Sequence, residues 1–191
     1  MNPYWEGKLV RLRAMEPGDA EHFYRINMER DVDRNLEMVW PPASMAGQQQ
    51  WVEEAAKKGF GENLEFKFQI EELVDGQLVG SIDTHHCNQR QGTFEYGLSV
   101  REQYRNKGFA SEAILLVLRY YFFELRFRKA EPGVFAYNPA SIRLHEKLGF
   151  VLEGIRRQHG YSHGEFHDLH LYGMTAEEFR DRHPQYLDFS D

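Results

Sequence analysis

The longest amphipathic helix that the sequence predicts spans about residues 108–125. Its apolar residues recur at the spacing of one helical face: Ala110, Ala113, Ile114, Val117, Leu118 and Tyr121. A stripe this wide has to be buried against another element, and the residues before the helix alternate as strands do, at 66–73, 77–87 and 93–100. The sequence therefore predicts a mixed α/β domain built on one central sheet.

Other local signals extend this pattern toward the N-terminus. Residues 8–14 alternate as a strand, and Pro17 suits the first turn of a helix. A second helix is expected over about 44–58, capped by the serine at its start. The dipeptide Asp75-Gly76 joins two of the strands as a hairpin.

After the long helix, residues 129–137 predict a strand, which Pro132 makes an edge or splayed strand. The next helix is expected to begin with Asn138 as its N-cap and to end at Gly149. Two closing strands are expected at 150–153 and 165–174. Thr175 and Glu178 then form the capping box of a last short helix.

Length and composition favour one folded domain over residues 1–191. No apolar run approaches the ~18 residues that a membrane span needs, and the N-terminus lacks the pattern of a secretory signal. The single cysteine, Cys87, excludes an internal disulfide and fits a reducing compartment. We therefore expect a cytoplasmic protein with no membrane partner.

The formal net charge is −7 with histidines neutral, and no basic run of the kind that binds nucleic acid is present in the sequence. We expect no nucleic-acid partner. An acidic surface is compatible with a cationic substrate such as an amine.

The segment QYRNKGFASEAI leads into the long helix and predicts an anion site. The first N–H groups of a helix have no intrahelical acceptor, and the helix dipole favours an anion there. Gly108 and Ala110 allow a phosphate to approach, Arg105 and Lys107 add positive charge, and Ser111 offers a further donor. The segment matches neither the Walker A loop nor the dinucleotide fingerprint, and an exposed basic turn is the alternative interpretation.

A second segment, AYNPASIRLHEKLGFVLEG, resembles the second signature of the GCN5-related N-acetyltransferase (GNAT) superfamily. The matching residues are Asn138, Ser141, His145, Lys147, Gly149 and Phe150. QYRNKGFASEAI is similar to the acyl-CoA pyrophosphate loop of the same superfamily, at Arg105, Gly108 and Ala110. The pair is more specific than either segment alone. KLVRLRAMEPGDA, TFEYGLSV and FVLEGIRR are similar to the branch related to RimJ and RimL, the ribosomal-protein N-terminal acetyltransferases.

The resemblance implies a GNAT fold, with a mostly antiparallel sheet that splays open between the strands at 93–100 and 129–137. It implies acetyl-CoA as acyl donor, with the pantetheine arm bonded to backbone groups of Leu98 and Val100. Asn138 is expected to reach the same arm, in competition with its capping role. The implied contacts of the pyrophosphate are Arg105, Asn106, Lys107, Gly108, Phe109, Ala110 and Ser111.

Enzymes of this superfamily transfer acetyl directly from the thioester to an amine, which must first lose a proton. Glu95, on the same strand face as Gly97 and Ser99, is the expected base, and a surface glutamate is the alternative interpretation. The departing thiolate needs a proton or a hydrogen bond. Ser141 is the first candidate donor. His145, which stands where many members carry tyrosine, is the second.

We expect no metal. Adjacent strand residues point to opposite faces, so His85 and His86 should not share an ion. The later histidines are spaced by four, four and three residues, but they fall in a glycine-containing segment rather than a helix, so these spacings do not form a ligand face: His159, His163, His167 and His170.

The sequence thus predicts an acetyl-CoA-dependent N-acetyltransferase acting on a primary amine, either a protein N-terminus or a small molecule. The alternative is a non-catalytic acyl-CoA-binding module with the same fold, which the missing tyrosine at His145 keeps open. Dimers are common among related enzymes, so a homodimer is one expected state.

Overall fold

The computed structural model describes residues 3–27, 41–57 and 63–187. The chain divides into two compact units. We call Met1–Asp83 with Gly97–Ala113 the first unit, and Thr84–Tyr96 with Ile114–Asp191 the second unit. The expectation of a single domain stays a prediction.

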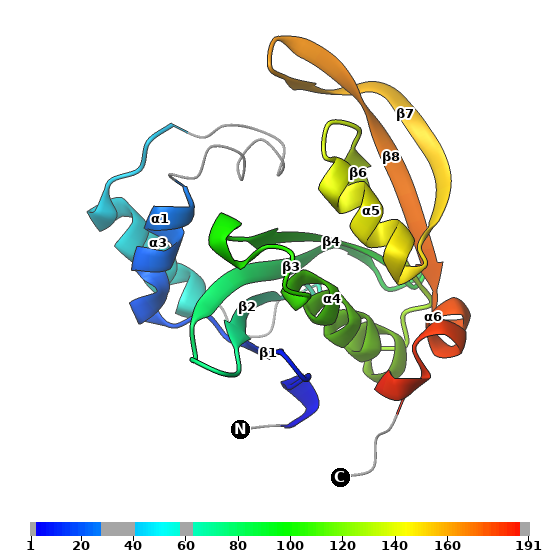
Figure 1. The fold of residues 1–191 in the computed structure, drawn as a ribbon, viewed down its shortest axis with the longest axis horizontal. Helices are drawn as coiled ribbons and strands as arrows, with labels where there is room; N and C mark the ends of the chain where they lie inside the picture. The colour runs from blue at the N-terminus through cyan, green and yellow to red at the C-terminus, as the bar shows by residue number, and fades with distance from the viewer. Residues whose placement is uncertain (1–2, 28–40, 58–62, 188–191) are drawn as a thin grey trace. The chain divides into compact units, whose positions relative to one another are not determined.

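The described strands form an eight-stranded sheet in which neighbours follow the order β1-β2-β3-β4-β5-β8-β6, and β7 also pairs with β8 (Figure 1). Most of these pairs are antiparallel, and β4 pairs with β5 in parallel. The expected mixed and mostly antiparallel sheet is confirmed. The strands are β1 Val10–Arg13, β2 Lys67–Glu72, β3 Leu78–Asn88, β4 Thr93–Val100, β5 Lys129–Ala130, β6 Gly133–Phe135, β7 Val151–Ser162 and β8 Glu165–Thr175.

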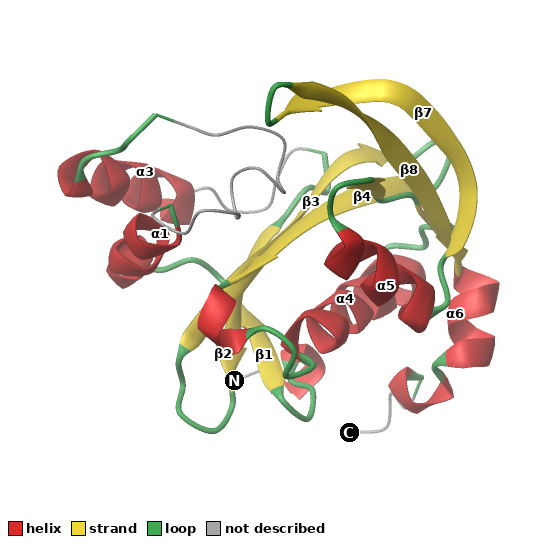
Figure 2. Ribbon diagram, turned by 45° about the horizontal axis from the view of Figure 1, so that its top comes forward, coloured by secondary structure: helices red, strands yellow, loops and turns green. Residues whose placement is uncertain are grey.

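Helices flank the sheet, as expected for this fold class (Figure 2). The described α-helices are α1 Ala20–Ile26, α3 Met45–Lys57, α4 Phe109–Arg119, α5 Pro139–Leu148 and α6 Ala176–Arg182. Short helical turns lie at η1 Pro3–Trp5, η2 Pro17–Asp19, η3 Glu102–Tyr104, η4 Tyr120–Glu124 and η5 Pro184–Tyr186. None of the described helices has the length and apolarity that crossing a membrane requires.

In the first unit, α1 and α3 pack over a small apolar cluster. Its buried members are Met15, Ala20, Phe23, Ile26 and Val52. The hydroxyl of Ser44 accepts a hydrogen bond from the backbone N–H of Gly47 at 3.0 Å, as a helix cap does. The predicted start of α3 is therefore confirmed.

A buried carboxylate in the first unit joins the start of β1 to the first turn of α4. Glu112 is 6% exposed, and its two oxygens accept hydrogen bonds of 2.7–2.8 Å from the backbone N–H groups of Lys8, Leu9 and Val10. Bonds to a charged acceptor contribute about 1.5–3 kcal/mol each. A Cβ at Gly7 would collide with this carboxylate, so only glycine lets the incoming chain approach it this closely.

Aromatic rings fill the core of the second unit. Phe94 stacks on Tyr121 with 4.1 Å between ring centroids, and Phe127 packs edge-on against both rings. Tyr121 lies in η4, a π-helical turn that continues α4. The helix predicted over 108–125 is therefore α4 followed by this wider turn.

Pro132 interrupts the strand predicted over 129–137, so that β5 and β6 are separate. The pairing of β5 with β4 covers two residues, and β6 pairs with β8. The carbonyl of Pro132 accepts a hydrogen bond from the backbone N–H of Tyr172 at 3.0 Å. The disruption expected from a proline that lacks a backbone donor is confirmed.

β7 is much longer than the strand predicted over 150–153, and it forms a long hairpin with β8 (Figure 1). Most residues along β7 are exposed, so burial does not alternate between its two faces. Gln158 has a φ of +52°, and the register of the pair shifts between Arg156 and Gly160. The sequence lacks the alternation that would have marked this strand.

Candidate functional site

The loop between η3 and α4, in the first unit, carries the residues expected to bind an anion. The backbone N–H of Glu112 donates to the carbonyl of Gly108 at 3.1 Å, which is the first bond of the helix. Phe109, Ala110 and Ser111 therefore supply the N–H groups of the first turn, which have no acceptor within the helix. The helix dipole adds partial positive charge at the same point.

Two left-handed residues shape this loop. Asn106 has a φ of +63° and Gly108 a φ of +90°. A Cβ at Gly108 would lie 3.0 Å from Cδ1 of Leu9, and any other residue would be strained at this φ. The backbone conformation thus requires glycine here, in addition to the close approach of an anion.

The two basic side chains of the loop have different surroundings. Nε of Arg105 donates to the carbonyl of Val100 at 3.1 Å and so ties the loop to the end of β4. Nζ of Lys107 lies 5.3 Å from the ring centroid of Tyr104 and 5.9 Å from that of Phe109. Lys107 is exposed beside the helix start.

Leu98 and Val100, whose backbone is expected to bond the pantetheine arm, are half-buried on the last part of β4. A Cβ at Gly80 of β3 would collide with the carbonyl oxygen of Ser99. Glycine at position 80 therefore allows the two strands to lie this close. The carbonyl of Val100 accepts the hydrogen bond from Nε of Arg105. A pantetheine contact at Leu98 or Val100 stays a prediction.

In the second unit, Asn138 begins α5. Its side-chain oxygen accepts a hydrogen bond from the backbone N–H of Ser141 at 3.0 Å, and Pro139 takes the first helical position. The N-cap role is therefore confirmed. The cap uses Oδ1, so the Nδ2 end of the amide is the part that a cofactor contact would use, and that contact stays a prediction.

Ser141 and His145 face each other one turn apart on α5. Nδ1 of His145 lies 2.8 Å from the carbonyl oxygen of Ser141 and 3.4 Å from its hydroxyl oxygen. A carbonyl can only accept, so Nδ1 carries the proton in the neutral ring, and Nε2 is the acceptor. His145 therefore cannot take a proton from Ser141 through Nδ1, and the pair is not a nucleophile with its base.

The ring of His145 is part of the core of the second unit. The residue is 3% exposed, and its ring stacks between those of Tyr96 and Tyr172, at centroid distances of 5.8 and 5.7 Å. Phe150 packs edge-on at 5.1 Å. Burial lowers the pKa of His145, so the neutral form is favoured and proton donation near neutral pH is disfavoured. This disfavours His145 as the donor, and the role of Ser141 stays a prediction.

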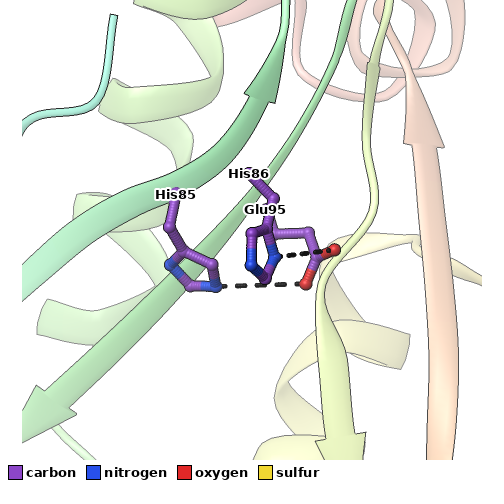
Figure 3. Close-up of side chains that lie close together, drawn as sticks. All are labelled: His85, His86 and Glu95. Atoms are coloured by element: carbon purple, nitrogen blue, oxygen red, sulfur yellow. Dashed lines mark ion pairs between the residues drawn. The ribbon is translucent and has the colours of Figure 1, made fainter. Parts of the chain in front are cut away.

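The carboxylate of Glu95 faces the imidazoles of two histidines of β3 (Figure 3). Its Oε1 is 3.3 Å from Nδ1 of His86, and its Oε2 is 3.9 Å from Nε2 of His85. The expectation that adjacent histidines point to opposite faces is wrong here, because His86 has a φ of +50° and leaves the strand conformation. The carboxylate expected to be the base therefore has two imidazoles beside it.

The acetyltransferase (GNAT) domain family matches residues 10–151 of the chain. The chain therefore belongs to the GNAT acetyltransferase family, as its two signature segments indicate. The expected class of enzyme, an N-acetyltransferase, is confirmed, and the closer link to the RimJ/RimL branch stays a prediction.

Individual relatives match over almost the whole chain. The SPbeta prophage-derived uncharacterized N-acetyltransferase YokL of Bacillus subtilis is 42% identical over 180 residues, which cover 94% of this chain and 97% of that protein. The spermidine N(1)-acetyltransferase of Vibrio cholerae is 27% identical over 91% of this chain and 96% of its own length. A crystal structure of spermidine N-acetyltransferase from Vibrio cholerae, in complex with CoA and spermine, has the same fold. Its TM-score is 0.77 at 23% identity, over 91% of this chain and 99% of that chain.

Gly108→Ala should abolish or strongly weaken acetyl-CoA binding, by at least about tenfold, because the new Cβ strains the loop at the helix start. Calorimetry measures the affinity. Gly164→Ala is the matched control, since Gly164 also has a positive φ (+84°) but has open space around it. It should carry a similar loss of stability and bind acetyl-CoA as the wild type does.

A folded Gly108→Ala variant with wild-type affinity would contradict the assignment of this loop. If that variant does not fold, Lys107→Ala tests the same point, since Lys107 is exposed. It should weaken acetyl-CoA binding a few-fold, and less at high salt. An unchanged affinity for acetyl-CoA at low salt would count against this loop as the pyrophosphate site.

Proposed function

We propose that the protein uses acetyl-CoA to acetylate the primary amine of a small cationic molecule by direct transfer. The observation that carries this proposal is the start of α4. There, a left-handed Gly108 precedes three N–H groups that lack helical acceptors, with Lys107 exposed beside them. This combination suits the pyrophosphate of acyl-CoA.

The class of acceptor is inferred from charge and from relatives. The net charge of −7 favours a cation over an anion as substrate. A relative that matches 91% of this chain is a spermidine N(1)-acetyltransferase. Polyamines are therefore the first acceptors to test, with a protein N-terminus as the alternative acceptor.

Direct transfer makes three chemical demands. The acceptor ammonium has to lose a proton, and we assign this to the carboxylate of Glu95, directly or through a water. The oxyanion of the tetrahedral intermediate needs donors, which backbone N–H groups near Leu98 and Val100 supply in this proposal. The CoA thiolate leaves with a proton or a hydrogen bond from a side chain.

We assign the last task to Ser141. The Nδ1–H group of His145 points at the carbonyl and hydroxyl oxygens of Ser141, so the serine proton is free to be donated elsewhere. His145 itself is buried and neutral, with its ring held between aromatic neighbours. The absence of a tyrosine at this position therefore does not remove every donor from α5.

Release of CoA thiol from acetyl-CoA, measured across a panel of amines, tests the function. The panel contains spermidine, spermine, amino acids, an aminoglycoside and peptides with free N-termini. We expect turnover with one or more small polyamines and little with the peptides. A peptide as the best substrate would instead favour N-terminal acetylation.

The same assay separates the enzyme from the non-catalytic module. Tight CoA binding without turnover on any amine would contradict the proposal and favour a module that binds acyl-CoA. Mass spectrometry of the product should show one added acetyl group on the amine, and none retained on the protein.

Ser141→Ala should lower kcat by about 10²-fold and leave the affinity for acetyl-CoA nearly unchanged, because only the donor to the leaving thiolate is lost. Alanine is a good helix former, so α5 should remain stable. Ser162→Ala, in the hairpin of β7 and β8, is the control and should keep the wild-type kcat. If Ser141→Ala also keeps it, Ser141 has no part in the chemistry.

A further inference from the structure

The side chains of His85, His86 and Glu95 converge in the second unit, on neighbouring strands of one hairpin (Figure 3). One ligand atom from each residue, two imidazole nitrogens and a carboxylate oxygen, lies within 4.8 Å of the other two. Among the described residues, no other group of three metal-ligating side chains comes this close together. The side chains are accessible, with 38% of His85, 74% of His86 and 38% of Glu95 exposed.

An unusual backbone conformation creates this convergence. His86 has a φ of +50° inside β3, where a regular strand would send adjacent side chains to opposite faces. A residue other than glycine in the left-handed region costs about 1–2 kcal/mol, although histidine adopts it more readily than most. This backbone conformation places both imidazoles beside one carboxylate. A strained backbone of this kind is a reason to look for a function.

From this geometry we infer that His85, His86 and Glu95 bind a divalent transition-metal ion such as Zn²⁺. Zinc bonds of about 2.0–2.1 Å place two ligands of a tetrahedral site about 3.4 Å apart. Nδ1 of His86 lies 3.3 Å from Oε1 of Glu95, which is close to that value, and Nε2 of His85 lies 3.9 Å from Oε2, the other oxygen of the same carboxylate. Two histidines and a glutamate are also a known ligand set for zinc with an open position.

The ligand types argue against the common hard cations. Mg²⁺ and Ca²⁺ prefer oxygen ligands, and one carboxylate with two imidazoles offers too few of them. Imidazole nitrogen suits zinc and its neighbours in the first transition row. The exposed edge of His86 gives the ion a path from solvent.

Metal binding and proton transfer would compete for the same carboxylate. A bound ion occupies the Glu95 oxygens that the proposed reaction uses as a base, so it should inhibit acetyl transfer. This consequence rests on the proposed function. The binding site itself does not, because it can be measured without either substrate.

Calorimetric titration of the protein, carrying no histidine tag, with Zn²⁺ and separately with Mg²⁺ tests the site. We expect one Zn²⁺ per chain, no comparable binding of Mg²⁺, and a Zn²⁺-dependent rise in Tm. His86→Ala and Glu95→Gln should each weaken Zn²⁺ binding by at least about tenfold, since even an outer partner of a metal ligand is worth that much.

His159→Ala, which removes an exposed histidine of β7, is the matched control and should bind Zn²⁺ as the wild type does. No saturable Zn²⁺ binding, or binding that His86→Ala and Glu95→Gln leave unchanged, overturns the proposal. All variants lie at accessible positions, and their Tm without metal shows whether they are folded.

Activity with Zn²⁺ present then separates this proposal from the proposed function. Binding at the site together with loss of acetyl transfer supports both the site and the role of Glu95 as base. Binding at the site with full activity supports the site and contradicts that role. Absence of binding removes the metal site and leaves the assignment of the base as it was.

Discussion

The first unit depends on one buried carboxylate. Glu112 gathers the backbone N–H groups of Lys8, Leu9 and Val10 and so fixes the first turn of α4 against the start of β1. Because the carboxylate and the N–H of Val10 are buried, each needs the other as a partner, and the interaction holds the backbone of two distant segments at once. The loop before α4 starts from this fixed turn. The backbone N–H of Glu112 also donates to the carbonyl of the left-handed Gly108, so the same residue joins this loop to the helix start.

The sequence predicted best what local chemistry determines. The cap at Ser44, the capping box of Thr175 with Glu178 and the stop at Gly149 all depend on a few adjacent residues, and the structure has each of them. The limits of β4 were predicted because its alternation is strong. The length of β7 was not, since a strand exposed on both faces carries no alternating pattern. The π-helical turn after α4 has no recognised signal in the sequence, because its residues also suit an ordinary helix.

The candidate site was predicted only in part, because only some of its features depend on residues that are adjacent in the sequence. The loop and the start of α5 are recognisable because their function needs specific residue types at fixed spacing. The burial of His145 follows from its place one turn before Leu148 on the packed face of α5, a spacing that the sequence does contain. The convergence of His85 and His86 on Glu95 could not be predicted, because it depends on a left-handed residue inside a strand. The role of Glu112 depends on partners about a hundred positions away in the chain, which local patterns cannot reveal.

The central claim is that the N–H groups at residues 109–111 bind the pyrophosphate of acetyl-CoA. Amide hydrogen exchange of these residues, measured by NMR, tests it most directly when CoA is compared with pantetheine, which lacks the pyrophosphate. CoA should slow exchange at these amides by at least about tenfold, because each gains a phosphate acceptor, and pantetheine should leave them unchanged. If CoA binds and these amides exchange as they do in the free protein, the pyrophosphate lies elsewhere and the account is wrong.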